Sequence, residues 1–268
     1  MKFLLSMLFV SGLSYAQVNQ VEIKNFNFSY KAPLGEGMAE SFSYQQQKMN
    51  QQKVFVEKFA EVFKIKLEGH ENQDLEFKGA PQLVQDADVI NLNGFNVGLS
   101  DQVSLSLTQG EFVSPHEKLS LKNVILSCDR IGQTAQILDE VLSGCLQRMS
   151  LKVSGFASEP EKGLDYSFME SLNSTFSASA SSLSIKNVDL KINAGKFQLK
   201  ADVKAQVSGT ATATGTAKYD LPSKKITVKV SEVKFGFLDL TAQVFEALKK
   251  QESDSLKVSK PYIYISIN

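Results

Sequence analysis

Residues 21–30 read VEIKNFNFSY, and four other segments repeat their pattern of apolar and polar positions. The repeats are INLNGFNVGL (90–99), LSLKNVILSC (119–128), LSIKNVDLKI (183–192) and VKVSEVKFGF (228–237). Each begins with alternating apolar residues, which is typical of a half-buried strand. After a polar pair such as Lys24-Asn25, the apolar positions move by one residue. Because side chains of a strand alternate between two faces, each repeat predicts a strand with a bulge or kink at the polar pair.

Bends at similar places in several strands indicate a curved sheet. We therefore expect an α+β fold, mostly β, in which a strongly bent antiparallel β-sheet wraps amphipathic helices. The simpler alternative is that bulged amphipathic strands merely look alike in sequence.

Three segments have the helical spacing of apolar residues and predict helices that cover the sheet. They are residues 38–64, 134–143 and 241–250. In the third, Asp239 is a candidate cap at the start, and Lys249-Lys250 complement the dipole at the end.

The N-terminus has the features of a secretory signal peptide over residues 1–16. A lysine is followed by an apolar run over 3–13 and then by Ser14-Tyr15-Ala16, with small residues at the positions that a signal peptidase reads. The run is too short to span a bilayer as a helix, so no transmembrane segment is predicted in the mature chain. We expect export to a periplasm or to the cell surface.

A stretch rich in serine, glycine and proline, residues 157–182, predicts a loop or linker. Before it lies a β-rich half with helices, residues 17–156, and after it an antiparallel sheet with one helix, residues 183–268. Whether these are two domains or two halves of one sheet stays open at this point.

The two cysteines, Cys128 and Cys145, predict a disulfide, because an exported chain with an even number of cysteines usually pairs them. An unbroken helix between them would hold their Cα atoms about 25 Å apart, far beyond disulfide reach. We therefore expect Cys128 to end a strand and the helix over 134–143 to stop at Gly144. Two separately buried thiols are the alternative.

One strand of the C-terminal half has almost no side-chain bulk on one face, because small residues alternate there with serine and threonine. Such a face lets another group approach the backbone closely. That group is either a packed helix, such as the one from Thr241, or a lipid chain. The candidate ligand-groove residues are Gly209, Ala211, Ala213, Gly215 and Ala217.

The composition favours no catalytic or metal chemistry. The chain has 29 basic and 29 acidic residues, and its lysines are dispersed along the sequence, so no nucleic-acid partner is predicted. His70 and His116 lie in polar, loop-like contexts without a second ligand at metal spacing. Asp86 and Asp88 lack the calcium-loop pattern. We predict no catalytic residue, metal or cofactor, although a hydrolase built on carboxylates that meet only in the fold stays open.

Residues 228–251, VKVSEVKFGFLDLTAQVFEALKKQ, carry a family resemblance. The segment resembles the end of bacterial periplasmic tubular lipid-binding (TULIP-like) domains, in which a strand, a Gly-x-Leu-Asp turn and a short amphipathic helix close a curved sheet. The bulged strands are also similar to those of AsmA-like groove proteins. The resemblance implies turn and cap roles for Gly236, Leu238 and Asp239, and binding of an acyl chain along an apolar groove.

The sequence therefore predicts a non-enzymatic exported envelope protein that binds a lipid or other amphipathic ligand in an apolar groove. The alternative is a structural or adhesive surface protein that acts through sheet-edge or surface contacts.

Overall fold

The computed structural model describes residues 21–44, 47–60, 62–69, 75–77, 82–115, 117–130, 137–160, 183–204, 208–250 and 252–267. Its strands are β1 (Val21–Lys31), β2 (Leu34–Tyr44), β3 (Gln47–Phe59), β4 (Val62–Leu67), β5 (Leu75–Phe77), β6 (Val89–Leu99), β7 (Gln102–Val113), β8 (Glu117–Asp129), β9 (Arg148–Pro160), β10 (Leu183–Asn193), β11 (Lys196–Lys204), β12 (Ser208–Asp220), β13 (Lys225–Phe235), β14 (Leu238–Asp239), β15 (Leu256–Ser259) and β16 (Tyr262–Ser266). Its helices are α2 (Gln82–Gln85), α3 (Ile137–Gln147) and α5 (Thr241–Lys249).

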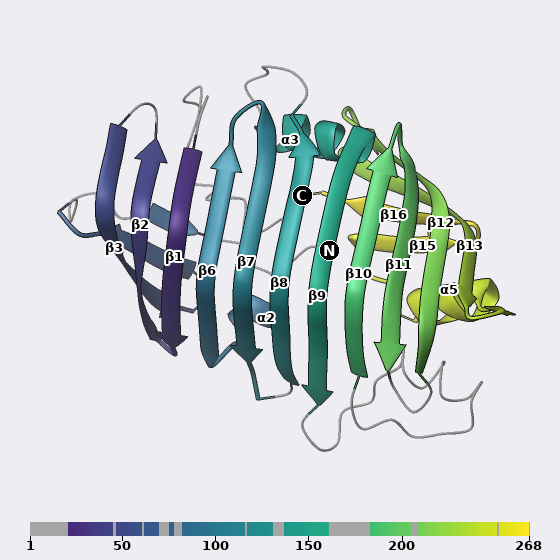
Figure 1. Cartoon of the computed structure of the whole chain (residues 1–268), viewed down its shortest axis with the longest axis horizontal. Coiled ribbons are helices and arrows are strands. Elements are labelled where there is room, and N and C mark those ends of the chain that lie inside the picture. Colours follow the sequence, from purple (N-terminus) through teal and green to yellow (C-terminus); the bar gives the residue numbers. More distant parts are fainter. Residues whose placement is uncertain are drawn as a thin grey trace.

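Within these ranges, sixteen strands form one antiparallel sheet (Figure 1). Along the sheet the order is β15-β16-β13-β12-β11-β10-β9-β8-β7-β6-β1-β2-β3-β4-β5, and β14 pairs with β13. From β6 to β13 each strand pairs with the next one along the chain. β9 extends to Pro160, so the first four residues of the predicted linker over 157–182 are strand, and the remainder lies outside the described residues. β9 pairs with β10, so both halves of the chain share one sheet.

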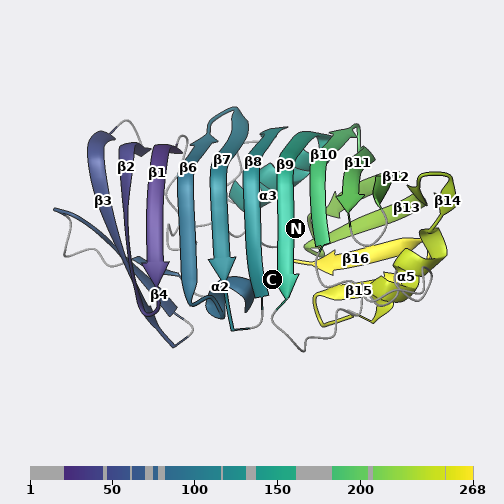
Figure 2. The same cartoon turned by 60° about the horizontal axis from the view of Figure 1, so that its bottom comes forward.

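The expectation of an α+β fold with a strongly bent sheet wrapped around helices is wrong. The protein is mostly β, and its sheet is neither closed nor strongly curled. Strands β6 to β10 run side by side, while β15 and β16 at one end are turned across them (Figure 2). Twist between neighbouring strands accumulates along any wide sheet, and it gives this change of direction without a closed container.

The helix expected over residues 38–64 is also wrong, since β2, β3 and β4 occupy this range. Its helical spacing came partly from Phe42 and Met49, which are seven residues apart. In the fold these two residues are direct partners across the β2–β3 hairpin. A hairpin can therefore place apolar residues at a helical interval without forming a helix.

The helix predicted near the C-terminus is confirmed. Helix α5 spans Thr241–Lys249, close to the expected range. Its N-cap is Leu240 and not the predicted Asp239, whose carboxylate accepts a hydrogen bond from the Thr241 N–H (2.8 Å). Hydrogen bonds with the Thr241 side chain and then with its N–H lower the pKa of Asp239. The turn at Asn193–Lys196 joins β10 to β11, with Ala194 and Gly195 in left-handed conformations, as hairpin turns of this kind require.

In four of the five repeats the predicted phase change is present as a left-handed residue, while in the fifth, residues 228–237, the β12–β13 register shifts between Thr214 and Gly215 instead. A further left-handed residue lies in β3. We call these five left-handed residues the bulge line: Gln51, Asn25, Gly94, Asn123 and Asn187, with φ between 47° and 63°. Strand register places them at one level across the sheet. Glu40 lies between Gln51 and Asn25, Thr108 between Gly94 and Asn123, and Ser154 between Asn123 and Asn187.

Side chains along the bulge line satisfy the backbone groups that leave the ladder. The Asn25 N–H donates to Asn96 Oδ1 (2.8 Å), and the Gly94 N–H donates to Asn27 Oδ1 (3.0 Å). The Asn96 amide in turn donates to the Gly94 carbonyl (3.0 Å) and to Ser106 Oγ (3.1 Å). Asparagine suits these positions because it tolerates the left-handed region and its short amide reaches nearby backbone.

Alignment of the bulges explains why the bent strands do not curl the sheet. A bulge curves a sheet when one strand carries a residue that its neighbour lacks. From β7 to β10 neighbouring strands change phase at the same level, so their pairing continues in register. Strand β11 keeps unbroken alternation, and the register accordingly shifts by one between Lys186 and Asp189.

The bulge line keeps the apolar residues on one face of the sheet. At one level Tyr30, Ile90, Phe112 and Leu119 are successive cross-strand partners, and all four are buried. We call this side the core face and the opposite side the outer face.

The bulge line gives a prediction at Asn123, whose side chain is exposed. Asn123→Ala should lower the free energy of unfolding by about 1 kcal/mol, because a Cβ without a compensating amide disfavours the left-handed region. Asn123→Gly should stay within about 0.5 kcal/mol of the wild type. Urea denaturation measures both, and equal losses for the two variants would contradict the backbone explanation.

Candidate functional site

A groove lies on the outer face where β1, β2, β3 and β4 meet. Its volume is about 590 Å³, within the range of small-molecule sites. Two rows of cross-strand partners supply most of its lining: Ser29–Glu36–Phe55–Lys66 and Lys31–Leu34–Glu57–Lys64, with Gly35 and Val56 beside them.

The groove combines exposed apolar surface with charge. Leu34 is 60% exposed and Phe55 is 42% exposed. Large apolar side chains usually avoid this much water when they lie together, so such a patch often marks a binding site. Three lysines and two glutamates surround the patch, which gives the groove a net positive charge. The arrangement suits a ligand with an apolar chain and an anionic head.

Sequence reasoning missed this groove, because the range 38–64 was assigned to a helix. The signal was the alternation of Lys53-Val54-Phe55-Val56-Glu57, which is the pattern of a strand with large residues on both faces. Only the pairing with β1, β2 and β4 shows that Phe55 and Leu34 share the outer face.

The candidate groove predicted on β12 is occupied in part by aromatic rings of neighbouring strands. A Cβ added at Gly209 would lie 2.6 Å from the Phe235 ring, and one added at Gly215 would lie 2.6 Å from the Phe197 ring. Gly209, Ala211, Ala213 and Gly215 are half-buried, and Ala217 is buried. A ligand role for these five residues stays a prediction. The glycines have a packing role in any case.

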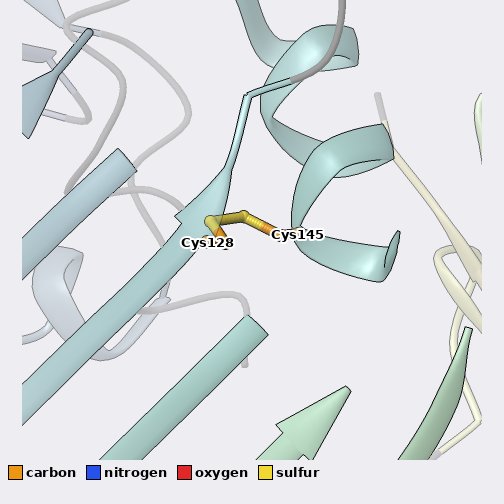
Figure 3. The surroundings of a disulfide bond; sticks show 2 residues. All are labelled: Cys128 and Cys145. Carbon is orange, nitrogen blue, oxygen red and sulfur yellow. A yellow bond between two sulfur atoms is a disulfide. The ribbon is translucent and has the colours of Figure 1, made fainter. Parts of the chain in front are cut away.

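Helix α3 is fixed to the sheet by the disulfide and by a close backbone contact. Cys128 lies near the end of β8 and Cys145 lies on α3, and the two are bonded (Figure 3). This confirms the predicted disulfide. The predicted helix stop at Gly144 is wrong, because α3 continues to Gln147. A Cβ at position 144 would lie 1.9 Å from the Asp129 carbonyl oxygen, so glycine is required there for helix and strand to touch.

Two buried carboxylates of α3 are paired with groups from elsewhere in the chain. Glu140 accepts from Arg130 Nε at 2.7 Å. Asp139 accepts from the Tyr219 hydroxyl at 2.6 Å and pairs with Lys224, at the two ends of the β12–β13 turn. Burial, followed by the hydrogen bond to Asp139, raises the pKa of Tyr219. These acids hold α3 against the sheet, and partners occupy them, as buried charges require.

The remaining candidate residues form no site in the described chain. His70 and His116 lie outside the described residues. Asp86 is exposed, and Asp88 joins the start of β6 to its neighbours through its backbone N–H and carbonyl. Among the residues that the structure describes, no group of three or more histidine, cysteine, aspartate or glutamate side chains is arranged to hold a metal ion.

Comparison with known proteins gave no match to a protein family, to a curated protein or to a solved structure. The residues of this chain therefore carry the functional argument alone.

The disulfide closes a loop with a sequence separation of 17 residues. Replacing both Cys128 and Cys145 with alanine should lower the free energy of unfolding by about 3 kcal/mol, because the unfolded chain regains the entropy of the open loop. Urea denaturation measures the change. A second check is thiol titration of the unfolded, unreduced wild type. Two free thiols there would contradict the bond.

The Tyr219 contact predicts a specific alkaline effect. Because its pKa is higher in the folded state than the usual 10, the contact stabilises the fold fully below pH 10 and loses its contribution as pH rises further. Tyr219→Phe should cost about 1.5–3 kcal/mol at neutral pH, as for a hydrogen bond to a charged group. As the pH rises from about 9.5 to 11, the free energy of unfolding of Tyr219→Phe should fall less steeply than that of the wild type.

Tyr264→Phe is the matched control, because Tyr264 stacks on Tyr262 at the C-terminal end of the sheet. Urea denaturation at several pH values compares the three proteins. Parallel alkaline profiles for the wild type and Tyr219→Phe would contradict the role of the hydroxyl.

Proposed function

We propose that this is an exported, non-enzymatic binding protein of a cell envelope, and that it holds an anionic amphipathic ligand, such as a lipid, in the groove of β1 to β4. The observation that carries the proposal is the exposure of Leu34 and Phe55 among Lys31, Lys64 and Lys66. An acyl chain would cover the apolar pair and gain about 0.8 kcal/mol per buried CH₂. The lysines would attract the head group.

Export is supported by the signal-like N-terminal sequence and by the disulfide, a bond that persists in oxidising compartments. In the described residues no helix has the length and apolarity needed to cross a bilayer. The resemblance to tubular lipid-binding and AsmA-like proteins agrees with the class of ligand, and it remains part of the proposal.

The alternative, adhesion through a sheet edge, finds less support at β15. Strand β15 is four residues long, and the Val258 N–H already donates to the Glu252 carboxylate at 2.8 Å. A partner strand would have to displace this side chain in order to pair.

The chain contains no tryptophan, so a single introduced tryptophan reports on one place. In Phe55→Trp, palmitate should shift the emission to shorter wavelength and saturate, because the ring would move from water to an acyl chain. Phe237→Trp is the control, because Phe237 is 92% exposed in the turn after β13. Palmitate should leave its emission unchanged.

A second measurement uses the wild type, so that no introduced tryptophan changes the groove. Native mass spectrometry of the wild type with palmitate should show a one-to-one complex, and Leu34→Asp should reduce its abundance at least tenfold, because a carboxylate would repel both parts of the ligand. No emission shift in Phe55→Trp together with no complex in the wild type would overturn the proposal.

A further inference from the structure

Lysines gather on the outer face of the C-terminal half of the sheet. Residues 183–268 contain 14 lysines and 8 acidic residues, although the whole chain is balanced. In β11 and β13 these lysines alternate with core residues, as does Lys152 in the neighbouring half on β9. The sequence shows them as dispersed, and strand alternation turns them to one side.

Cross-strand pairing arranges these cations in two rows. One row runs Lys152–Asp189–Lys200–Thr212–Lys234, and a second runs Arg148–Asn193–Lys196–Thr216–Lys229. Between them on the same face lies the row Ser150–Lys191–Gln198–Thr214–Glu232. The six basic residues of the two rows form what we call the cation grid. Its members stand on alternate strands, about 10 Å apart across the sheet and about 13 Å apart along a strand.

Within the part of the chain that the structure describes, ion pairs engage only two of the six basic residues of the cation grid. Lys234 pairs with Glu232 and Arg148 pairs with Asp129. Lys152, Lys196, Lys200 and Lys229 are exposed and form no ion pair with another described residue. The Asp189 carboxylate, which lies between Lys152 and Lys200, pairs with Lys191. At spacings of about 10 to 13 Å, at or beyond the Debye length of about 8 to 10 Å at physiological salt, these cations repel one another only weakly, so they can stay together on one face and attract an external anion.

The chemistry of the face narrows the class of partner. Of the described residues, no aromatic side chain lies on the outer face from β8 to β13. Proteins that bind single-stranded nucleic acid stack bases on a series of aromatic rings, whereas the nearest rings here, the stacked Tyr262 and Tyr264, lie on β16 at the edge of the grid, where Tyr262 is the partner of Lys229. Its cations are mostly lysines, which attract phosphate as point charges without fixing its orientation. Between the cations of each row stand Asp189 or Asn193 on β10 and a threonine on β12.

The shape of the face favours a flat partner. Six strands span about 24 Å across, and eleven residues span about 36 Å along a strand. β8 to β11 run side by side with α2 and α3 behind them (Figure 1), whereas β13 turns away together with its partner β16 (Figure 2). We propose that this face docks the protein on the surface of a bilayer that contains anionic phospholipid.

The groove opens on the same face. A row of direct partners runs from Ser29 in the groove to Lys204 on β11, by way of Asn91, Glu111, Ser120, Ala157 and Ser184. Docking would therefore turn the groove toward the membrane. The docking inference does not rest on the groove, because its evidence is the grid alone.

The test uses vesicles of phosphatidylcholine with about one third phosphatidylglycerol, and vesicles of phosphatidylcholine alone. The wild type should sediment with the first and not with the second, and about 1 M salt should release it, because the Debye length falls to about 3 Å. In the variant with Lys152→Gln, Lys200→Gln and Lys229→Gln, the partition constant should fall about 100-fold, since each lysine near an anionic surface contributes about fivefold.

The control carries Lys249→Gln and Lys250→Gln, which lie at the end of α5 and outside the outer-face rows. Its partition constant should stay within about threefold of the wild type. Equal losses in the two variants, no binding to anionic vesicles, or tighter binding to duplex DNA than to these vesicles would each overturn the inference. The palmitate response of Phe55→Trp should persist in the grid variant, so failure of the groove and failure of the grid are separate results.

Discussion

The fold depends on keeping one side of every strand apolar through a change of phase in the middle of the strand. A strand that slips by one residue would turn half of its apolar residues to water. Left-handed residues at Asn25, Gly94, Asn123 and Asn187 prevent this, and each carries a backbone conformation that most residues disfavour. Because neighbouring strands slip together, the ladder resumes beyond the bulge line and the sheet stays wide and open.

Much of this local structure could be predicted from the sequence, because it depends on neighbouring residues. The bulged strands, the Cys128–Cys145 bond, helix α5 and the turn at Asn193 follow from alternation, spacing and turn chemistry. Curvature could not be predicted, since it depends on whether the next strand is bulged at the same level. The sequence of one strand does not contain that information. The apparent helix over 38–64 failed for a related reason, because a hairpin also brings distant apolar residues together.

The groove and the cation grid could not be predicted from the sequence, because they too depend on how neighbouring strands align. Each consists of residues from several strands that share a face only through register. Leu34, Phe55 and Lys64 come from three strands, and Lys152, Lys200 and Lys229 come from three others. The strip of small residues on β12 is continuous in the sequence, so it could be recognised there as a candidate ligand groove. In the fold its glycines make room for Phe197 and Phe235, which shows how a local pattern can report packing as readily as binding.

The carboxylate of Glu252 at the β15 edge bears on how the molecule avoids self-assembly. A broad sheet is a template for fibril growth wherever its terminal strand offers free backbone donors. Here the last strand is short, and one of its donors is already engaged by an acidic side chain from the same chain. An incoming strand at that end meets a negative charge before it meets backbone. This charge opposes the addition of further strands there, although the sheet is wide.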